Sequence, residues 1–105
     1  MSESYVAMTL YFRVAGTDAG ELRALAEARA EFYRDFPGLV LKAFVHDAEA
    51  GRYGSHYIWR DEAAARAFRE SDLIAQMVRR FGHQPEIHQY QVLALVQPQA
   101  SDIGS

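Results

Sequence analysis

The sequence has no cysteine, only three prolines, and no apolar run that approaches the roughly 18 residues of a membrane-spanning helix. Without cysteine, the chain forms no disulfide, uses no thiolate in catalysis and holds no cysteine-ligated zinc. The formal net charge of −3 leaves no positive excess to neutralise phosphates, so we predict neither nucleic acid nor a membrane as a partner. Residues 1–4 lack a basic stretch followed by an apolar one, so we expect no secretory signal and a cytoplasmic protein.

The length and composition are those of one globular domain. Half of the 105 residues are hydrophobic and 24% are charged, which argues against disorder. A chain of this size buries about two-thirds of its unfolded surface, enough for one core. We predict a single domain over residues 1–96 and a polar, flexible tail over residues 97–105.

Four segments have the alternation or the residue content of β-strands: residues 5–13, 39–46, 53–60 and 86–96. One side of the first segment is apolar: Val6, Met8, Leu10 and Phe12. In the second segment, strict alternation predicts two opposite faces. One carries Leu39, Leu41, Ala43 and Val45, and the other carries Val40, Lys42, Phe44 and His46. In the last segment, alternation groups His88, Tyr90, Val92, Ala94 and Val96 on one face.

Helix signals separate these segments. Asp18 and Glu21 have capping-box spacing, and apolar residues at steps of three and four predict a helix over residues 18–36. Asp61 is the predicted N-cap of an alanine-rich helix over residues 62–70. Ser71 caps a second helical segment, which Gly82 ends.

The order of these elements is βαββαβ. Right-handed crossovers place the helices on one face of a four-stranded antiparallel sheet, so we predict a ferredoxin-like α+β fold. The other face should be polar in a monomer, yet both faces of the second and last strands carry large apolar residues. At roughly 25 cal/mol per Å², leaving such a patch in water forfeits many kcal/mol. We therefore predict a homodimer that packs sheet to sheet.

Several of these residues also match a family pattern. Pro37-Gly38-Leu39, Lys42 and the run from Tyr57 to Glu62 before an alanine-rich helix resemble the antibiotic-biosynthesis-monooxygenase-like dimeric α+β barrels. The resemblance covers about residues 5–96 and is closest to the small YdhR-type monooxygenases. It implies a pocket between the sheet and the helices of each subunit. The superfamily includes quinol and anthrone oxygenases, haem-degrading enzymes, cyclases and dehydratases, so the fold alone does not define the reaction.

The resemblance implies a cofactor-independent monooxygenase that acts on a small aromatic, quinol or polyketide-type molecule. Deprotonation turns such a substrate into an anion that can pass an electron to O₂. The protein must supply a base, hydrogen-bond donors for the anion and an aromatic, water-poor cavity. Two alternatives remain open: a cyclase or lyase in the same pocket, and a non-catalytic protein that binds a small hydrophobic ligand.

Histidines, tyrosines and one tryptophan on the predicted strands are the candidate site residues. We predict His88 or His46 as the base, and Tyr57 and Tyr90 as hydrogen-bond donors. The predicted substrate-binding residues are Trp59, His56, Tyr11 and Phe44. For each residue the alternative is packing in the core or the dimer interface, or a solvated position. His56 flanks Tyr57 on the opposite face, so those two side chains cannot enter one pocket.

A metal site is conceivable on His83, Glu86 and His88, which lie close together in the sequence. No compact ligand motif supports it, so we predict no metal and no other cofactor. The sequence also has no glycine-rich phosphate loop and no nucleophile elbow.

Overall fold

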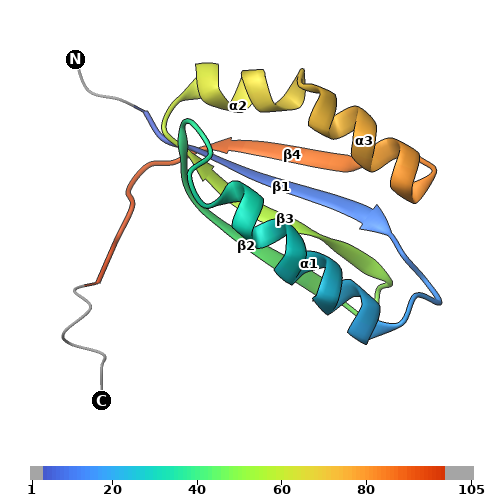
Figure 1. The fold of residues 1–105 in the computed structure, drawn as a ribbon. Helices are drawn as coiled ribbons and strands as arrows, with labels where there is room; N and C mark the ends of the chain where they lie inside the picture. The colour runs from blue at the N-terminus through green and yellow to red at the C-terminus, as the bar shows by residue number, and fades with distance from the viewer. Residues whose placement is uncertain (1–3, 99–105) are drawn as a thin grey trace.

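A computed structural model describes residues 4–98 and shows one sheet covered on one face by helices (Figure 1). Its elements are β1 (Val6–Arg13), α1 (Ala19–Tyr33), β2 (Leu39–Asp47), β3 (Arg52–Trp59), α2 (Glu62–Arg69), α3 (Asp72–Phe81) and β4 (Glu86–Gln91). The strands form an antiparallel sheet in the order β2-β3-β1-β4. α1 lies along one half of the sheet, and α2 and α3 lie along the other (Figure 1). This confirms the predicted ferredoxin-like α+β fold.

The predicted helix starts are confirmed. The Asp18 carboxylate accepts a hydrogen bond from Glu21 N–H at 3.0 Å, and the Asp61 carboxylate accepts one from Ala64 N–H at 2.8 Å. The Ser71 hydroxyl accepts a hydrogen bond from Leu73 N–H and so separates α3 from α2. These caps satisfy backbone donors that a helix leaves without partners at its N-terminus. Among residues 4–98, no helix is long and apolar enough to cross a membrane.

α1 is shorter than predicted. It ends at Tyr33, and Arg34 to Phe36 form tight turns in which Phe36 N–H bonds to the Tyr33 carbonyl. This turn directs the Phe36 ring toward Trp59 and Phe68, with ring centroids 5.9 Å and 6.2 Å away. Pro37 follows directly, and a proline disfavours helical geometry in the residue before it.

The core lies between the sheet and the helices. All four residues on the predicted apolar side of β1 are buried: Val6, Met8, Leu10 and Phe12. Gly54 of β3 permits the close approach of β1, because a Cβ at this position would overlap the Leu10 carbonyl oxygen. Tyr57 and Trp59 of β3 point to this same side and are almost fully buried.

A bulge in β2 changes which residues share a face. Leu39 pairs with Trp59, and Lys42 pairs with Tyr57, so β2 has one residue more than β3 between these pairs. Leu39 therefore packs against the core on the same face as Lys42. The prediction that Leu39 shares a face with Leu41 is wrong, because strict alternation does not survive an inserted residue.

β4 ends five residues earlier than predicted. Gln91 pairs with Val6 at the start of β1, and the last hydrogen bond joins Val92 N–H to the Tyr5 carbonyl. Beyond this point no strand lies alongside, and the chain leaves the sheet (Figure 1). The predicted strand beyond Gln91 is therefore wrong for a single chain. Residues 1–3 and most of the predicted tail, residues 99–105, lie outside the described part of the chain.

Candidate functional site

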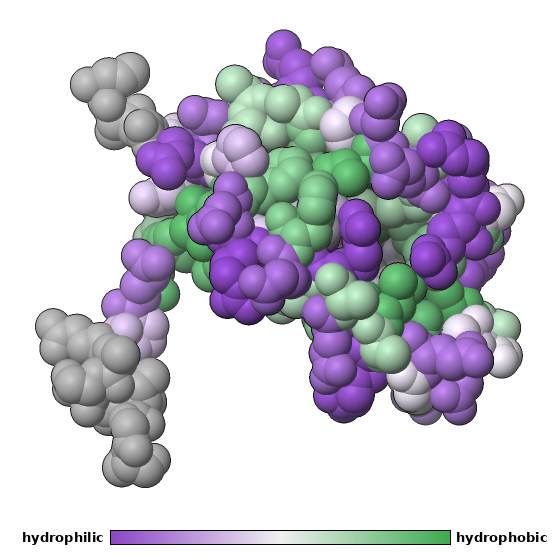
Figure 2. All heavy atoms as spheres, in the orientation of Figure 1, coloured by the Kyte–Doolittle hydropathy of each residue, from purple (hydrophilic) through white to green (hydrophobic). Residues whose placement is uncertain are grey.

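A cavity of about 600 Å³ opens between α1 and α3, above the centre of the sheet. Residues of α1 line one side of the cavity, residues of α3 line the other, and β1, β2 and β3 form its floor. In the orientation of Figure 1, hydrophobic residues gather between the helices and hydrophilic residues surround them (Figure 2). The volume falls within the range of small-molecule sites, roughly 300–1,000 Å³.

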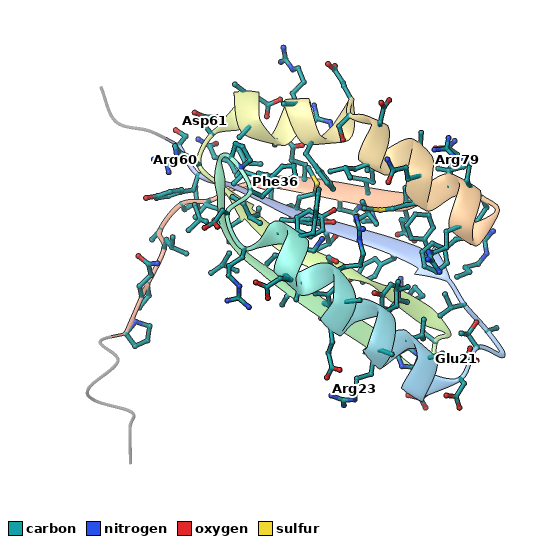
Figure 3. All side chains as sticks on the ribbon, in the orientation of Figure 1. Glu21, Arg23, Phe36, Arg60, Asp61 and Arg79 are labelled. Carbon is teal, nitrogen blue, oxygen red and sulfur yellow. The ribbon has the colours of Figure 1, made fainter. Side chains whose placement is uncertain are left out.

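Aromatic side chains form the walls of this cavity. Tyr33 of α1 faces Phe44 of β2, with ring centroids 6.3 Å apart, and Tyr53 of β3 packs against Phe81 of α3 at 5.8 Å. Figure 3 shows side chains from the sheet and from both helical layers converging in this space. Such walls suit a flat aromatic ligand, because aromatic rings pack well in offset and edge-to-face arrangements.

Lys42 reaches into the cavity from β2. Its Nζ lies 3.3 Å from the centre of the Tyr33 ring, 4.4 Å from that of Phe44 and 4.5 Å from that of Tyr57. It also donates a hydrogen bond of 3.3 Å to the Tyr57 hydroxyl. Burial, and to a lesser degree the charge of Arg29, lowers the pKa of Lys42 from 10.5 to about 7. The amine is therefore partly neutral at neutral pH.

The tyrosines of the cavity keep their protons. Burial raises the pKa of Tyr57 far above its usual value, and burial also raises the pKa of Tyr33 and that of Tyr53. Tyr33 is only 5% exposed, and by distance and angle its hydroxyl has no hydrogen-bond partner within residues 4–98, although Arg29 is near enough to oppose the rise in its pKa. A buried hydroxyl without a partner costs about 1–3 kcal/mol, so a ligand that accepts its hydrogen bond gains affinity.

The electrostatic character of the cavity is positive. Arg29, Lys42, Arg79 and Arg80 line it, and no aspartate or glutamate in the described part of the chain does so. Charges act more strongly in a partly buried site than in water, because the effective dielectric constant is lower. The site therefore favours a ligand that carries or develops negative charge.

The predicted site residues on the helix-covered face of the sheet lie in three different places. Tyr57 and Phe44 line the cavity. Trp59 is fully buried behind Tyr57, with the two rings stacked at 5.5 Å, and does not line it. His46 is exposed and borders a second hollow of about 460 Å³ beside the start of α1.

The other predicted site residues lie on the opposite face of the sheet. His56 and His88 both pair with Thr9 of β1, one from each side, and the Tyr11 and His56 rings meet edge to face at 6.2 Å. Tyr90 follows on the same face of β4 and is 56% exposed. The sheet separates all of these side chains from the cavity of their own chain. The structure thus does not bring His88 together with Tyr57.

The three residues considered as a metal site have other partners. The Arg13 backbone N–H donates to His83 Nε2 at 3.1 Å, so a neutral His83 carries its proton on Nδ1 and donates it to the Phe81 carbonyl. His88 Nε2 lies 2.6 Å from a carboxylate oxygen of Glu86, and this hydrogen bond lowers the pKa of Glu86. Within residues 4–98, no three His, Cys, Asp or Glu side chains gather as metal ligands.

Sequence reasoning missed the two charged residues at the centre of the cavity. Arg29 stands within the apolar stripe of α1, and Lys42 stands on the β2 face that carries Phe44. The sequence signal for both is a charged residue at a position where the apolar pattern of the helix or strand predicts an apolar residue. Lys42 is also the only lysine in the chain.

Comparison with known proteins identifies the family. Residues 5–80 match the family model described as "Antibiotic biosynthesis monooxygenase". A search of curated proteins finds no match to the chain.

Several solved structures share the fold. A heme-degrading protein from Mycobacterium tuberculosis aligns with a TM-score of 0.66 at 18% identity, covering 90% of this chain and 98% of its own. SnoaB, a cofactor-independent oxygenase from Streptomyces nogalater, aligns with a TM-score of 0.62 at 19% identity, covering 90% of this chain and 98% of its own. The ActVA-Orf6 monooxygenase of Streptomyces coelicolor, solved with nanaomycin D, aligns with a TM-score of 0.61 at 16% identity, covering 92% of this chain and 94% of its own. At such identities the likeness concerns the fold.

Proposed function

The chain belongs to the antibiotic biosynthesis monooxygenase family, and we propose that it is a cofactor-independent monooxygenase of a small aromatic phenol or quinol. One observation carries this proposal: a cavity with aromatic walls that is lined by three arginines and one partly buried lysine. Similarity in fold to a cofactor-independent oxygenase supports the reaction type. The motifs around Pro37-Gly38 and Tyr57 to Glu62 support a place among the YdhR-type members.

The cavity matches the electronic demands of this reaction. Loss of the phenolic proton leaves an electron-rich anion, which Arg29 stabilises where it lines the cavity. The anion passes one electron to O₂, and the resulting radicals combine into a carbon–oxygen bond. One oxygen atom then stays in the product and the other leaves as water, with both electron pairs supplied by the substrate. The apolar walls limit competing reactions with solvent.

Among the described residues, no histidine lines this cavity. Neither His88 nor His46 lines it, so their assignment as base stays a prediction. The same holds for Tyr90, His56 and Tyr11, which lie across the sheet from the substrate space.

We also propose a homodimer that packs through the uncovered face of the sheet. Beside polar residues such as Thr9, His56 and His88, every strand contributes apolar residues to this face: Ala7, Tyr11, Leu41, Ala43, Val45, Ile58 and Tyr90. Beyond β4, the apolar residues Leu93 and Val96 are 92% and 82% exposed. A second copy of the chain would cover the apolar residues of this sheet face as well as Leu93 and Val96. Removal of this apolar surface from water favours the dimer.

The function is tested with anthrones and hydroquinones as substrates. We expect O₂ uptake and, under ¹⁸O₂, a product that contains one labelled oxygen atom. A product that forms without O₂ uptake and contains no labelled oxygen would instead identify a cyclase or lyase. Saturable binding without any product would identify a ligand-binding protein. Either of these results overturns the monooxygenase proposal.

A further inference from the structure

We propose that Lys42 is the proton acceptor of this cavity: its amine takes the phenolic proton of the bound substrate, an inference that rests on the proposed function. Lys42 is held for this role by regular structure. It pairs with Tyr57 across β2 and β3, so its backbone belongs to the sheet rather than to a loop. Its Nζ lies among the rings of Tyr33, Phe44 and Tyr57 at the wall of the cavity.

The other groups that line the cavity cannot take this proton near neutral pH. Arginine side chains remain charged at every accessible pH. The tyrosines have pKa values raised by burial and keep their own protons. Among the described residues, no histidine, aspartate or glutamate lines the cavity. The charged and titratable groups that line it with Lys42 are Arg29 and Tyr33 of α1, Tyr53 and Tyr57 of β3, and Arg79 and Arg80 of α3.

The electrostatics favour proton transfer to Lys42 only when substrate is present. Within residues 4–98, Lys42 forms no ion pair with a carboxylate. Its protonated form therefore lacks a counter-charge in the empty cavity. When the substrate O–H bond breaks, its electron pair stays on oxygen and the proton forms a new N–H bond. The phenolate then supplies the missing negative charge, and the nearby Arg29 stabilises it as well.

Tyr57 completes this arrangement. Its hydroxyl oxygen accepts a hydrogen bond from Lys42, and a hydroxyl can donate its own proton at the same time. A phenolate next to the amine can accept this second hydrogen bond. Since a base works best when its pKa lies near the working pH, the pKa of about 7 suits Lys42 to this step.

The first experiment follows a chromogenic phenol, 4-nitrophenol, on binding to the purified protein in weakly buffered solution. Absorbance reports formation of the phenolate, and a pH indicator reports protons released to the solution. With the wild type we expect phenolate to form without matching proton release, because Lys42 keeps the proton. Lys42→Arg should also bind phenolate, but it should release one proton to the solution for each phenolate bound, since arginine supplies charge but accepts no proton. Lys42→Met should bind the neutral phenol.

Equal proton release by the wild type and Lys42→Arg would overturn the proposal, as would phenolate formation without matching proton release in Lys42→Met. The matched control is Arg60→Met, which removes one positive charge from the exposed β3–α2 turn outside the cavity (Figure 3). It should behave as the wild type. A merely structural role of Lys42 would make Lys42→Arg and the wild type alike in proton release.

A second measurement uses the fact that the chain has one lysine. Protein labelled with ¹³C-lysine gives one lysine signal, whose pH titration should have its midpoint near 7 and move upward when the phenol is bound. A midpoint in the ordinary lysine range would contradict the proposal. In the oxygen-uptake assay, kcat should fall by about 10²-fold or more in Lys42→Met. Unchanged turnover in Lys42→Met would refute the role of Lys42 and leave the monooxygenase proposal intact. If the wild type ionises the phenol as expected but takes up no O₂ with any substrate, the role of Lys42 stands and the monooxygenase proposal is refuted.

Discussion

Lys42 and Tyr57 face each other across β2 and β3, with Nζ 3.3 Å from the hydroxyl oxygen. One is an amine whose pKa falls to about 7, and the other is a phenol whose pKa rises because it is buried. Burial thus brings a potential proton acceptor and a permanent proton donor into contact on the wall of one cavity. Pairs of titratable groups with pKa values displaced by their surroundings are typical of functional sites.

Removal of the Lys42 charge should stabilise the protein in a pH-dependent way. Below about pH 7 the amine is protonated in both states, and the folded state bears the full cost of burying it. As the pH rises toward the unfolded value of about 10.4, this cost disappears. Denaturant unfolding of Lys42→Met should show a gain on the order of a few kcal/mol at about pH 6 that vanishes by about pH 10. A gain independent of pH, or a loss, would contradict the buried amine.

Gly54→Ala should disrupt the sheet. The added methyl group would overlap the Leu10 carbonyl oxygen, and backbone on both strands would have to move. We expect a loss of about 3 kcal/mol or more in the free energy of unfolding, or failure to fold. Gly16→Ala is the control: Gly16 has φ of +87°, but no atom lies within 4 Å of the place that a methyl group would take, so it should lose only about 1–2 kcal/mol. Equal losses would show that contact with β1 is unimportant.

Leu41→Glu should dissociate the proposed homodimer. Leu41 is 44% exposed on the uncovered face, and a second copy would bring two such carboxylates into an apolar interface. Sedimentation at micromolar concentration should give twice 11.9 kDa for the wild type and 11.9 kDa for the variant. Ala28→Glu, at an exposed position of α1, adds the same charge on the helix side and should remain dimeric. A monomeric wild type would refute the interface.

Tyr33→Phe should separate stability from ligand binding. The Tyr33 hydroxyl is buried without a partner, so its removal should raise the free energy of unfolding by about 1 kcal/mol. It should also weaken 4-nitrophenolate binding about 5- to 10-fold, because the anion loses a hydrogen bond. Denaturant unfolding and equilibrium titration measure the two effects. Tyr5→Phe, outside the cavity lining, should leave phenolate affinity unchanged. Unchanged affinity in Tyr33→Phe would mean that the hydroxyl does not meet the ligand.

The sequence predicts much of the site's scaffold but little of the site. It places Tyr57 and Phe44 at the pocket, and both line the cavity. It also places Trp59 there, but this ring lies behind Tyr57. His88 shares no face with Tyr57, because one sheet separates them. Alternation assigns residues to two faces, but it does not say which face receives the helices when both are apolar.

Local physics in the sequence determined where elements begin and which residues of β1 are buried. Asp18, Asp61 and Ser71 cap helices through contacts within three residues, and a period of two defines the apolar side of β1. Only the tertiary structure decided the bulge at Val40, the end of β4 and the environment of Lys42. Each depends on a neighbouring strand or helix that is distant in the sequence: β3 defines the bulge, the start of β1 ends β4, and α1 buries the amine.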